Sequence, residues 1–198
     1  MSVKKYYNIA KNNLYPICRS ITGQGTFKTL KIIKNSLPNL KIKKIKSGTK
    51  VFDWRIPPEW NIIDAYVIDK DGLKIIDFKK HNLHLVGYSI PVKKTLTKKN
   101  FFKNLFFLKK QPTAIPYITS YYKKRWGFCI SYNEFKTFDK KYSPTDKFKI
   151  VINSSLNSNG NLNYAELILK GKSKQEILIS TYVCHPSMAN NELSGPIV

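Results

Sequence analysis

Arginine is almost absent from this strongly basic chain. Only three of its 35 basic residues are arginines (Arg19, Arg55 and Arg125), although the formal net charge is +23. Proteins that read nucleic-acid sequence favour arginine, because its planar guanidinium forms paired hydrogen bonds with bases and phosphates. Abundant lysine, asparagine and isoleucine are typical of an A/T-rich genome. Nothing except the charge favours a nucleic-acid-binding module. We therefore expect no specific nucleic-acid partner and interpret the lysines as solvated surface residues.

Cysteines and long apolar runs are scarce as well. The three cysteines, Cys18, Cys129 and Cys184, have no paired spacing, which is typical of a reducing compartment and not of a disulfide scaffold. No apolar run approaches the length of a membrane span, and the first residues lack the apolar core of a signal peptide. We therefore expect a cytoplasmic protein without a membrane span. The oligomeric state cannot be inferred from the sequence.

Apolar and aromatic residues are sufficient for a folded core. They make up 42% and 13% of the 198 residues, which suits one domain or a domain with an insertion. Helical periodicity before Pro38 changes afterwards to short strands with many turn signals. We therefore predict an α/β fold: residues 1–50 and 133–198 form a partial α/β domain, and residues 51–132 form a β-rich inserted domain.

The pattern predicts individual elements within these parts. Helices are expected at 6–18, 27–35 (with Thr26 as the cap), 97–108 and 133–138. Two hairpins are expected, one joining 62–69 to 73–78 and one joining 147–153 to 162–169.

A short β-branched run at residues 177–183 comes just before His185. Such a run predicts a strand that is buried on both faces, as in a parallel α/β sheet. Ligands and catalytic groups of these sheets gather beyond the carboxyl ends of the strands. Taken alone, His185 fits a hydrogen-bonded histidine at a strand end better than a metal ligand.

Four separated motifs carry a resemblance to a known family. They lie at residues 14–23, 47–54, 119–129 and 184–196, and together they extend over nearly the whole chain. In this order they resemble the N-terminal part of a bacterial aminopeptidase-like family associated with polysaccharide biosynthesis, within the zinc-dependent exopeptidase clan. The resemblance implies a mixed sheet with helices, interrupted by a β-rich lobe. Because family members are about twice as long, it also implies a chain that is truncated at its C-terminus.

The resemblance also implies metal ligands. His185 falls at the first zinc-ligand position of the clan, whereas Asn191 stands where the clan has a bridging aspartate and Ser187 where a second aspartate orients the histidine. A neutral amide offsets the charge of two dications less well than a carboxylate does. Glu192 would take that role only if the register slips by one residue. The expected metal ligands are therefore His185, Asn191 and Glu192, with zinc as the cofactor.

The implied function is that of a zinc hydrolase fragment acting on a small peptide, amide or sugar-linked substrate. Its catalytic residues are expected beyond Val198, so we expect the isolated chain to bind zinc weakly and not to hydrolyse aminoacyl amides. The alternative is a non-catalytic relative that binds a sugar or peptide in surface polysaccharide biosynthesis. Asn191 in place of aspartate favours that alternative.

Substrate-binding candidates are Arg125, Trp126, Tyr121 and Arg19. The first three combine aromatic faces with a guanidinium, which suits stacking on a sugar or peptide and binding of a carboxylate. An aromatic packing corner, closed by an ion pair from the arginine to Asp53 or Asp77, fits about equally well, and the family motif favours the site. For Arg19, a structural ion pair or carbonyl clamp is favoured over an anion site.

His81 and His84 are three residues apart but have no acidic or thiol companion nearby. We expect both to be hydrogen-bonded structural histidines.

Overall fold

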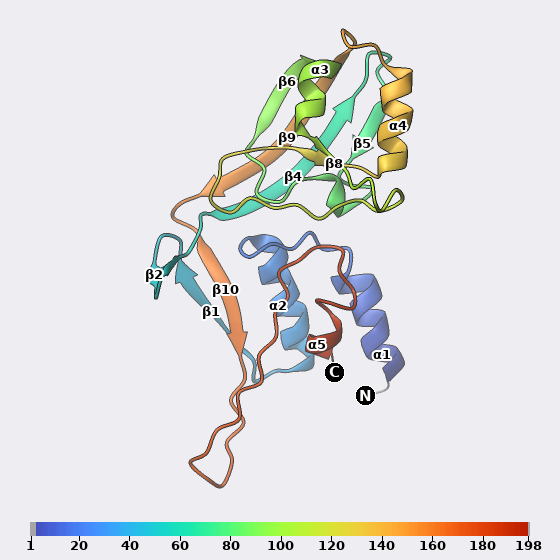
Figure 1. Cartoon of the computed structure of the whole chain (residues 1–198). Coiled ribbons are helices and arrows are strands. Elements are labelled where there is room, and N and C mark those ends of the chain that lie inside the picture. The colour runs from blue at the N-terminus through green and yellow to red at the C-terminus, as the bar shows by residue number, and fades with distance from the viewer. Residues whose placement is uncertain (1–2, 198) are drawn as a thin grey trace. The chain divides into compact units, whose positions relative to one another are not determined.

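The computed structural model describes residues 3–197, and the chain divides into two compact mixed α/β units (Figure 1). The first consists of Met1–Glu59 and Asn157–Val198, and the second of Trp60–Leu156. These bounds differ from the predicted ones, because residues 51–59 fall in the first unit and residues 133–156 in the second. No helix within residues 3–197 has the length and the apolar run needed to cross a membrane.

Three helices open the first unit: α1 (Val3–Asn8), the π-helix η1 (Ile9–Leu14) and α2 (Gln24–Ser36). The first two together overlap the helix predicted at 6–18 but end at Leu14, before Pro16, which cannot continue a regular helix. Helix α2 begins earlier than predicted. Its N-cap is Gly23, with φ of 92°, and Thr26 lies inside the helix, where its hydroxyl donates to the Ser20 carbonyl.

Two strands form the main sheet of the first unit. Strand β1 (Lys41–Lys46) pairs antiparallel with β10 (Asn161–Glu166), and α2 lies against both. The small hairpin of β2 (Lys50–Val51) and β3 (Trp54–Arg55) and the helix α5 (Ser194–Ile197) complete the unit.

The second unit is built on a four-stranded sheet with the order β5-β4-β9-β6. Its strands are β4 (Glu59–Ile68), β5 (Lys74–Asp77), β6 (Val92–Thr97) and β9 (Lys147–Asn157). The predicted hairpin of β4 and β5 is confirmed. The predicted pairing of 147–153 with 162–169 is wrong, because β9 pairs with β6 and β10 pairs with β1. The turn between β9 and β10 therefore connects strands of two different sheets.

Alternation along β9 shows where the core of the second unit lies. Phe148, Ile150 and Ile152 are buried, and Phe148 packs against the rings of Phe101 and Tyr142. The predicted helix at 97–108 is only α3 (Lys98–Phe101) and the 3-10 helix η3 (Phe102–Asn104), because the chain then enters a short strand at Leu105–Phe106.

The remaining elements of the second unit are short, apart from α4. They are the 3-10 helix η2 (Asn82–His84), the parallel pair β7 (Leu105–Phe106) and β8 (Phe128–Cys129), and α4 (Tyr132–Lys141). A capping box between Ser131 and Glu134 begins α4.

The predicted buried strand at 177–183 does not form. Ile177, Leu178 and Ile179 are 93%, 91% and 90% exposed, and Figure 1 shows the segment after β10 as a loop. A strand needs a neighbour to complete its backbone hydrogen bonds, and no described strand of residues 3–197 pairs with this segment. The apolar run therefore predicted a pairing that this part of the chain does not supply.

Candidate metal centre

A turn after the exposed segment brings three potential metal ligands together in the first unit. Its backbone reverses through Ser187, whose φ is 55°, and the Leu193 amide donates to the Ala189 carbonyl at 3.0 Å. Leu193 is buried in the same turn, only 2% exposed. Glu192, the residue before it, is buried as well.

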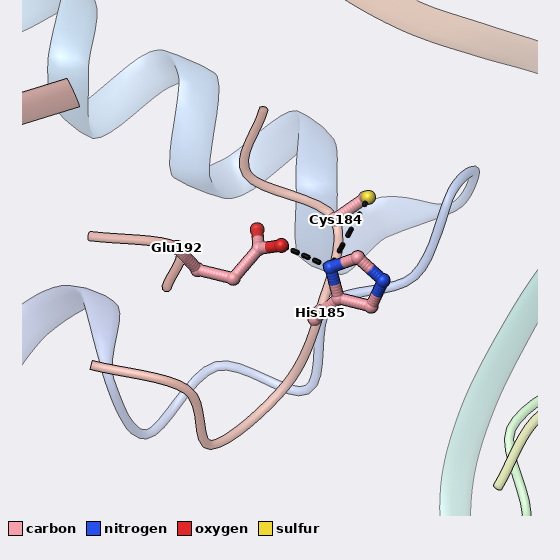
Figure 2. A group of neighbouring side chains, drawn as sticks. All are labelled: Cys184, His185 and Glu192. Atoms are coloured by element: carbon pink, nitrogen blue, oxygen red, sulfur yellow. Dashed lines mark hydrogen bonds and ion pairs between the residues drawn. The ribbon is translucent and has the colours of Figure 1, made fainter. Parts of the chain in front are cut away.

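Cys184, His185 and Glu192 meet in this turn (Figure 2). The cysteine sulfur, His185 Nδ1 and a Glu192 carboxylate oxygen all lie within 4.8 Å of one another. His185 Nδ1 is 3.7 Å from Cys184 Sγ and is hydrogen-bonded to Glu192 Oε1. Among the described residues, no other group of three His, Cys, Asp or Glu side chains gathers in this way.

Glu192 is the most deeply buried of the three side chains. Its side chain is fully buried, and its second oxygen, Oε2, has no hydrogen-bond partner among the described residues. A buried carboxylate is costly unless a positive charge lies nearby. Burial and the Glu192 charge both raise the pKa of the Cys184 thiol, to about 11, against a smaller opposing effect of Arg19. At neutral pH the free thiol is therefore protonated.

Arg19 lies behind this turn and not on the surface. Its side chain is 1% exposed, Nε donates to the His185 carbonyl at 3.1 Å, and Nη1 donates to the Leu14 carbonyl. Burial lowers the pKa of the guanidinium, while Glu192 and the nearby thiols raise it. The predicted substrate-binding role of Arg19 conflicts with this burial, and the carbonyl clamp is the alternative that fits.

Asn191 lies outside the cluster. It is exposed, and its side-chain oxygen accepts a hydrogen bond from the Tyr182 hydroxyl at 3.0 Å. The structure therefore brings Glu192, one residue later, to the imidazole of His185. The turn geometry decides between these neighbours, since adjacent residues of a turn point in different directions.

The other predicted substrate-binding residues belong to the second unit. Arg125 is exposed and donates from Nη2 to the Thr119 carbonyl at 2.6 Å. Trp126 is 8% exposed, and Tyr121 makes an edge contact with the buried ring of Tyr88 at 5.0 Å. Trp126 is thus buried and Tyr121 half-buried, and the arginine donates to a main-chain carbonyl and not to Asp53 or Asp77.

The two other histidines have structural roles, as predicted. His81 Nδ1 accepts from the Leu83 amide at 3.2 Å, and His84 Nδ1 is 2.8 Å from the Cys129 carbonyl oxygen.

Sequence reasoning missed Cys184 as a member of the cluster. Cys184 was interpreted through the unpaired spacing of the cysteines and as part of the motif at 184–196, and not as a ligand, although it directly precedes His185. Its signal was the adjacent thiol and imidazole, followed seven residues after the histidine by a glutamate.

Comparison with known proteins places the chain in a family. Residues 7–198 match the family described as Domain of unknown function (DUF4910). The chain belongs to this family. A Clostridium acetobutylicum protein, provisionally named a polysaccharide biosynthesis protein with an aminopeptidase-like domain, is 49% identical over 189 residues, covering 96% of this chain and 42% of the relative.

A solved structure is similar to this chain in fold as well as in sequence. A crystal structure from Clostridium acetobutylicum, provisionally named a peptidase, matches with a TM-score of 0.90 at 47% identity, covering 98% of this chain and 44% of that one. The predicted resemblance to aminopeptidase-like polysaccharide-biosynthesis proteins is thus confirmed. The chain spans about two fifths of the length of both relatives.

Proposed function

We propose that this chain supplies a zinc-binding turn to an aminopeptidase-like hydrolase that acts on an amide or peptide-type substrate. The observation that carries the proposal is the meeting of Cys184, His185 and Glu192 within 4.8 Å. Both relatives bear peptidase-like names, which supports the reaction class but not the substrate.

The three side chains fit zinc in type and in number. Thiolate, imidazole and carboxylate are all common zinc ligands, and catalytic zinc sites use three protein ligands with one open position. The unpartnered Oε2 of Glu192 is a buried acceptor that a cation would satisfy. A thiolate and a carboxylate together balance the charge of one dication, which a cluster containing neutral Asn191 would not. When bound, zinc polarises a substrate carbonyl and lowers the pKa of a coordinated water.

The chain's own residues have defined parts in this proposal. His185 presents Nδ1 to the site while its carbonyl is held by Arg19. Buried Glu192 presents a carboxylate oxygen to the same imidazole nitrogen. We assign ligand and positioning roles, and no general base, to the residues of this chain.

A non-catalytic relative that binds a sugar or peptide is the second candidate. The observation that favours it is Asn191, which carries no charge and is bonded to Tyr182 and not to the cluster. In such a protein the turn would hold a single structural ion, or none.

A cobalt titration tests the metal proposal. Co²⁺ substitutes for zinc and gives visible absorption bands that report tetrahedral coordination and a thiolate-to-metal band in the near ultraviolet. We expect one equivalent to bind to the wild-type chain with both features. His185→Ala and Glu192→Gln should each weaken binding by about tenfold or more, about 1.4 kcal/mol, and Cys184→Ser should remove the thiolate band.

Asn191→Ala is the matched control, because it changes the neighbouring exposed residue and should leave the titration unchanged. Absence of Co²⁺ and Zn²⁺ binding by the wild-type chain would contradict the metal proposal and leave the binding-module candidate. Equal losses in Asn191→Ala and Glu192→Gln would show that the cluster is assigned to the wrong residues.

A further inference from the structure

The turn that carries Arg19 is unusually constrained for a loop without an assigned role. At Gly25, a Cβ atom would lie 2.0 Å from the Cys18 carbonyl oxygen, so the start of α2 packs directly on the turn. The Thr26 hydroxyl donates a hydrogen bond to the Ser20 carbonyl. Gly23 takes a φ of 92°, which side chains rarely adopt. These contacts therefore fix the backbone position of Arg19, from which its side chain extends.

The guanidinium joins two segments that are far apart in the sequence. One nitrogen donates to Leu14, the last residue of η1, and another donates to the main chain of His185, 166 residues away from Arg19. The third, Nη2, is buried without a hydrogen-bond partner among the described residues, as is Glu192 Oε2. A guanidinium holds its donors in a rigid planar fork, whereas the donors of a lysine ammonium rotate at the end of a flexible side chain and fix two carbonyls less firmly.

We infer that Arg19 is the positioning residue of the metal-binding turn. It fixes the backbone of His185 and places a positive charge near buried Glu192, so that the imidazole and carboxylate are ordered before an ion arrives. The inference rests on the proposed metal site for its consequence, but the ordering of His185 is a property of the metal-free chain. Arginine at this position is notable because lysine supplies nearly all other positive charge.

The test compares two changes at Arg19 with a matched control. Arg19→Met removes the hydrogen-bond donors and keeps most of the side-chain volume. Arg19→Lys keeps the positive charge but replaces the guanidinium by a single ammonium group. Arg55→Met is the control, since Arg55 also donates to a main-chain carbonyl, that of Gly48 at 2.7 Å, but is exposed.

Two readouts separate positioning from general stability. The imidazole signals in the NMR spectrum are simple to assign, because the chain has only three histidines. Iodoacetamide labelling of Cys184, quantified by peptide mass spectrometry, reports whether the turn opens. Co²⁺ affinity is measured on the same samples.

We expect Arg19→Met to shift or broaden the His185 signal alone, to speed Cys184 labelling, and to weaken Co²⁺ binding by about 10- to 100-fold, the usual effect of losing a residue that orients a ligand. Arg19→Lys should recover part of each effect, and Arg55→Met should match the wild type. If the wild-type chain binds no Co²⁺, the proposed function fails, and the NMR and labelling results alone decide the role of Arg19. An unchanged His185 signal and labelling rate in Arg19→Met, or equal changes in Arg55→Met, would overturn the inference.

Discussion

Two buried carboxylates, Asp69 and Glu192, are satisfied in different ways. Asp69 accepts hydrogen bonds from the Leu73 and Asp71 amides at 2.9 and 3.0 Å, and from the Tyr142 hydroxyl at 2.7 Å. Glu192 has one bonded oxygen and one without a partner within residues 3–197. A carboxylate with several donors is a structural group, whereas one with a free buried oxygen is suited to receive a cation.

Asp69 gives a pH-dependent prediction for the second unit. Burial raises the pKa of its carboxyl, but the hydrogen bonds, led by that of Tyr142, lower it by more, so the net pKa lies below the usual 3.8. A depressed folded-state pKa stabilises the protein above about pH 4, and that stabilisation is lost as the pH falls through the folded pKa. Tyr142→Phe should therefore cost about 1.5–3 kcal/mol at pH 7 and progressively less below pH 4.

Urea denaturation at several pH values measures this cost. Tyr7→Phe, which removes a hydroxyl from a ring that is 59% exposed, is the control and should be neutral throughout. A cost for Tyr142→Phe that is independent of pH would show that the hydroxyl does not act through Asp69.

Elements with local signals were predictable from the sequence, and those that depend on distant partners were not. The hairpin of β4 and β5 follows from its Asp-Gly turn, and most of α2 follows from its apolar spacing, although its N-cap is Gly23 and not the predicted Thr26. The pairing of β9 with β6 depends on residues about fifty positions apart, which no local pattern specifies. The same limit applies to the site: the resemblance pointed to His185, but only the folded turn shows that Glu192 and Cys184 face it.

The exposed segment at 177–179 gives a prediction at the scale of an element. Ile179→Lys should change the free energy of unfolding by less than about 0.5 kcal/mol, because the side chain is 90% exposed. Ile152→Lys, with the same change in charge and volume, should cost more than about 3 kcal/mol, because Ile152 is 2% exposed in β9. Thermal or chemical denaturation compares the two variants. Similar costs for both would show that 177–179 is buried in solution.

Each candidate site of the chain lies within one of its two structural units. The first unit contains Cys184, His185, Glu192 and the buried Arg19, and the second contains the aromatic residues around Tyr121 and Trp126. Secondary-structure patterns placed the boundaries near residues 50 and 132, at the ends of the stretch with many short strands and turn signals. The compact units instead meet at 59/60 and 156/157, because β4 and β9 are long strands of the second sheet. The sheet to which each strand belongs, and not the local sequence pattern, determines where the two units divide.

The most direct test is a crystal structure of the chain grown with zinc, with diffraction recorded on both sides of the zinc absorption edge. We expect one anomalous peak about 2.0–2.3 Å from Cys184 Sγ, His185 Nδ1 and a Glu192 oxygen, the normal zinc-ligand distances. The carbonyl of His185 should remain bonded to Arg19. A peak beside Asn191 with Glu192 turned away, or a map without a peak in this turn, would contradict the metal centre.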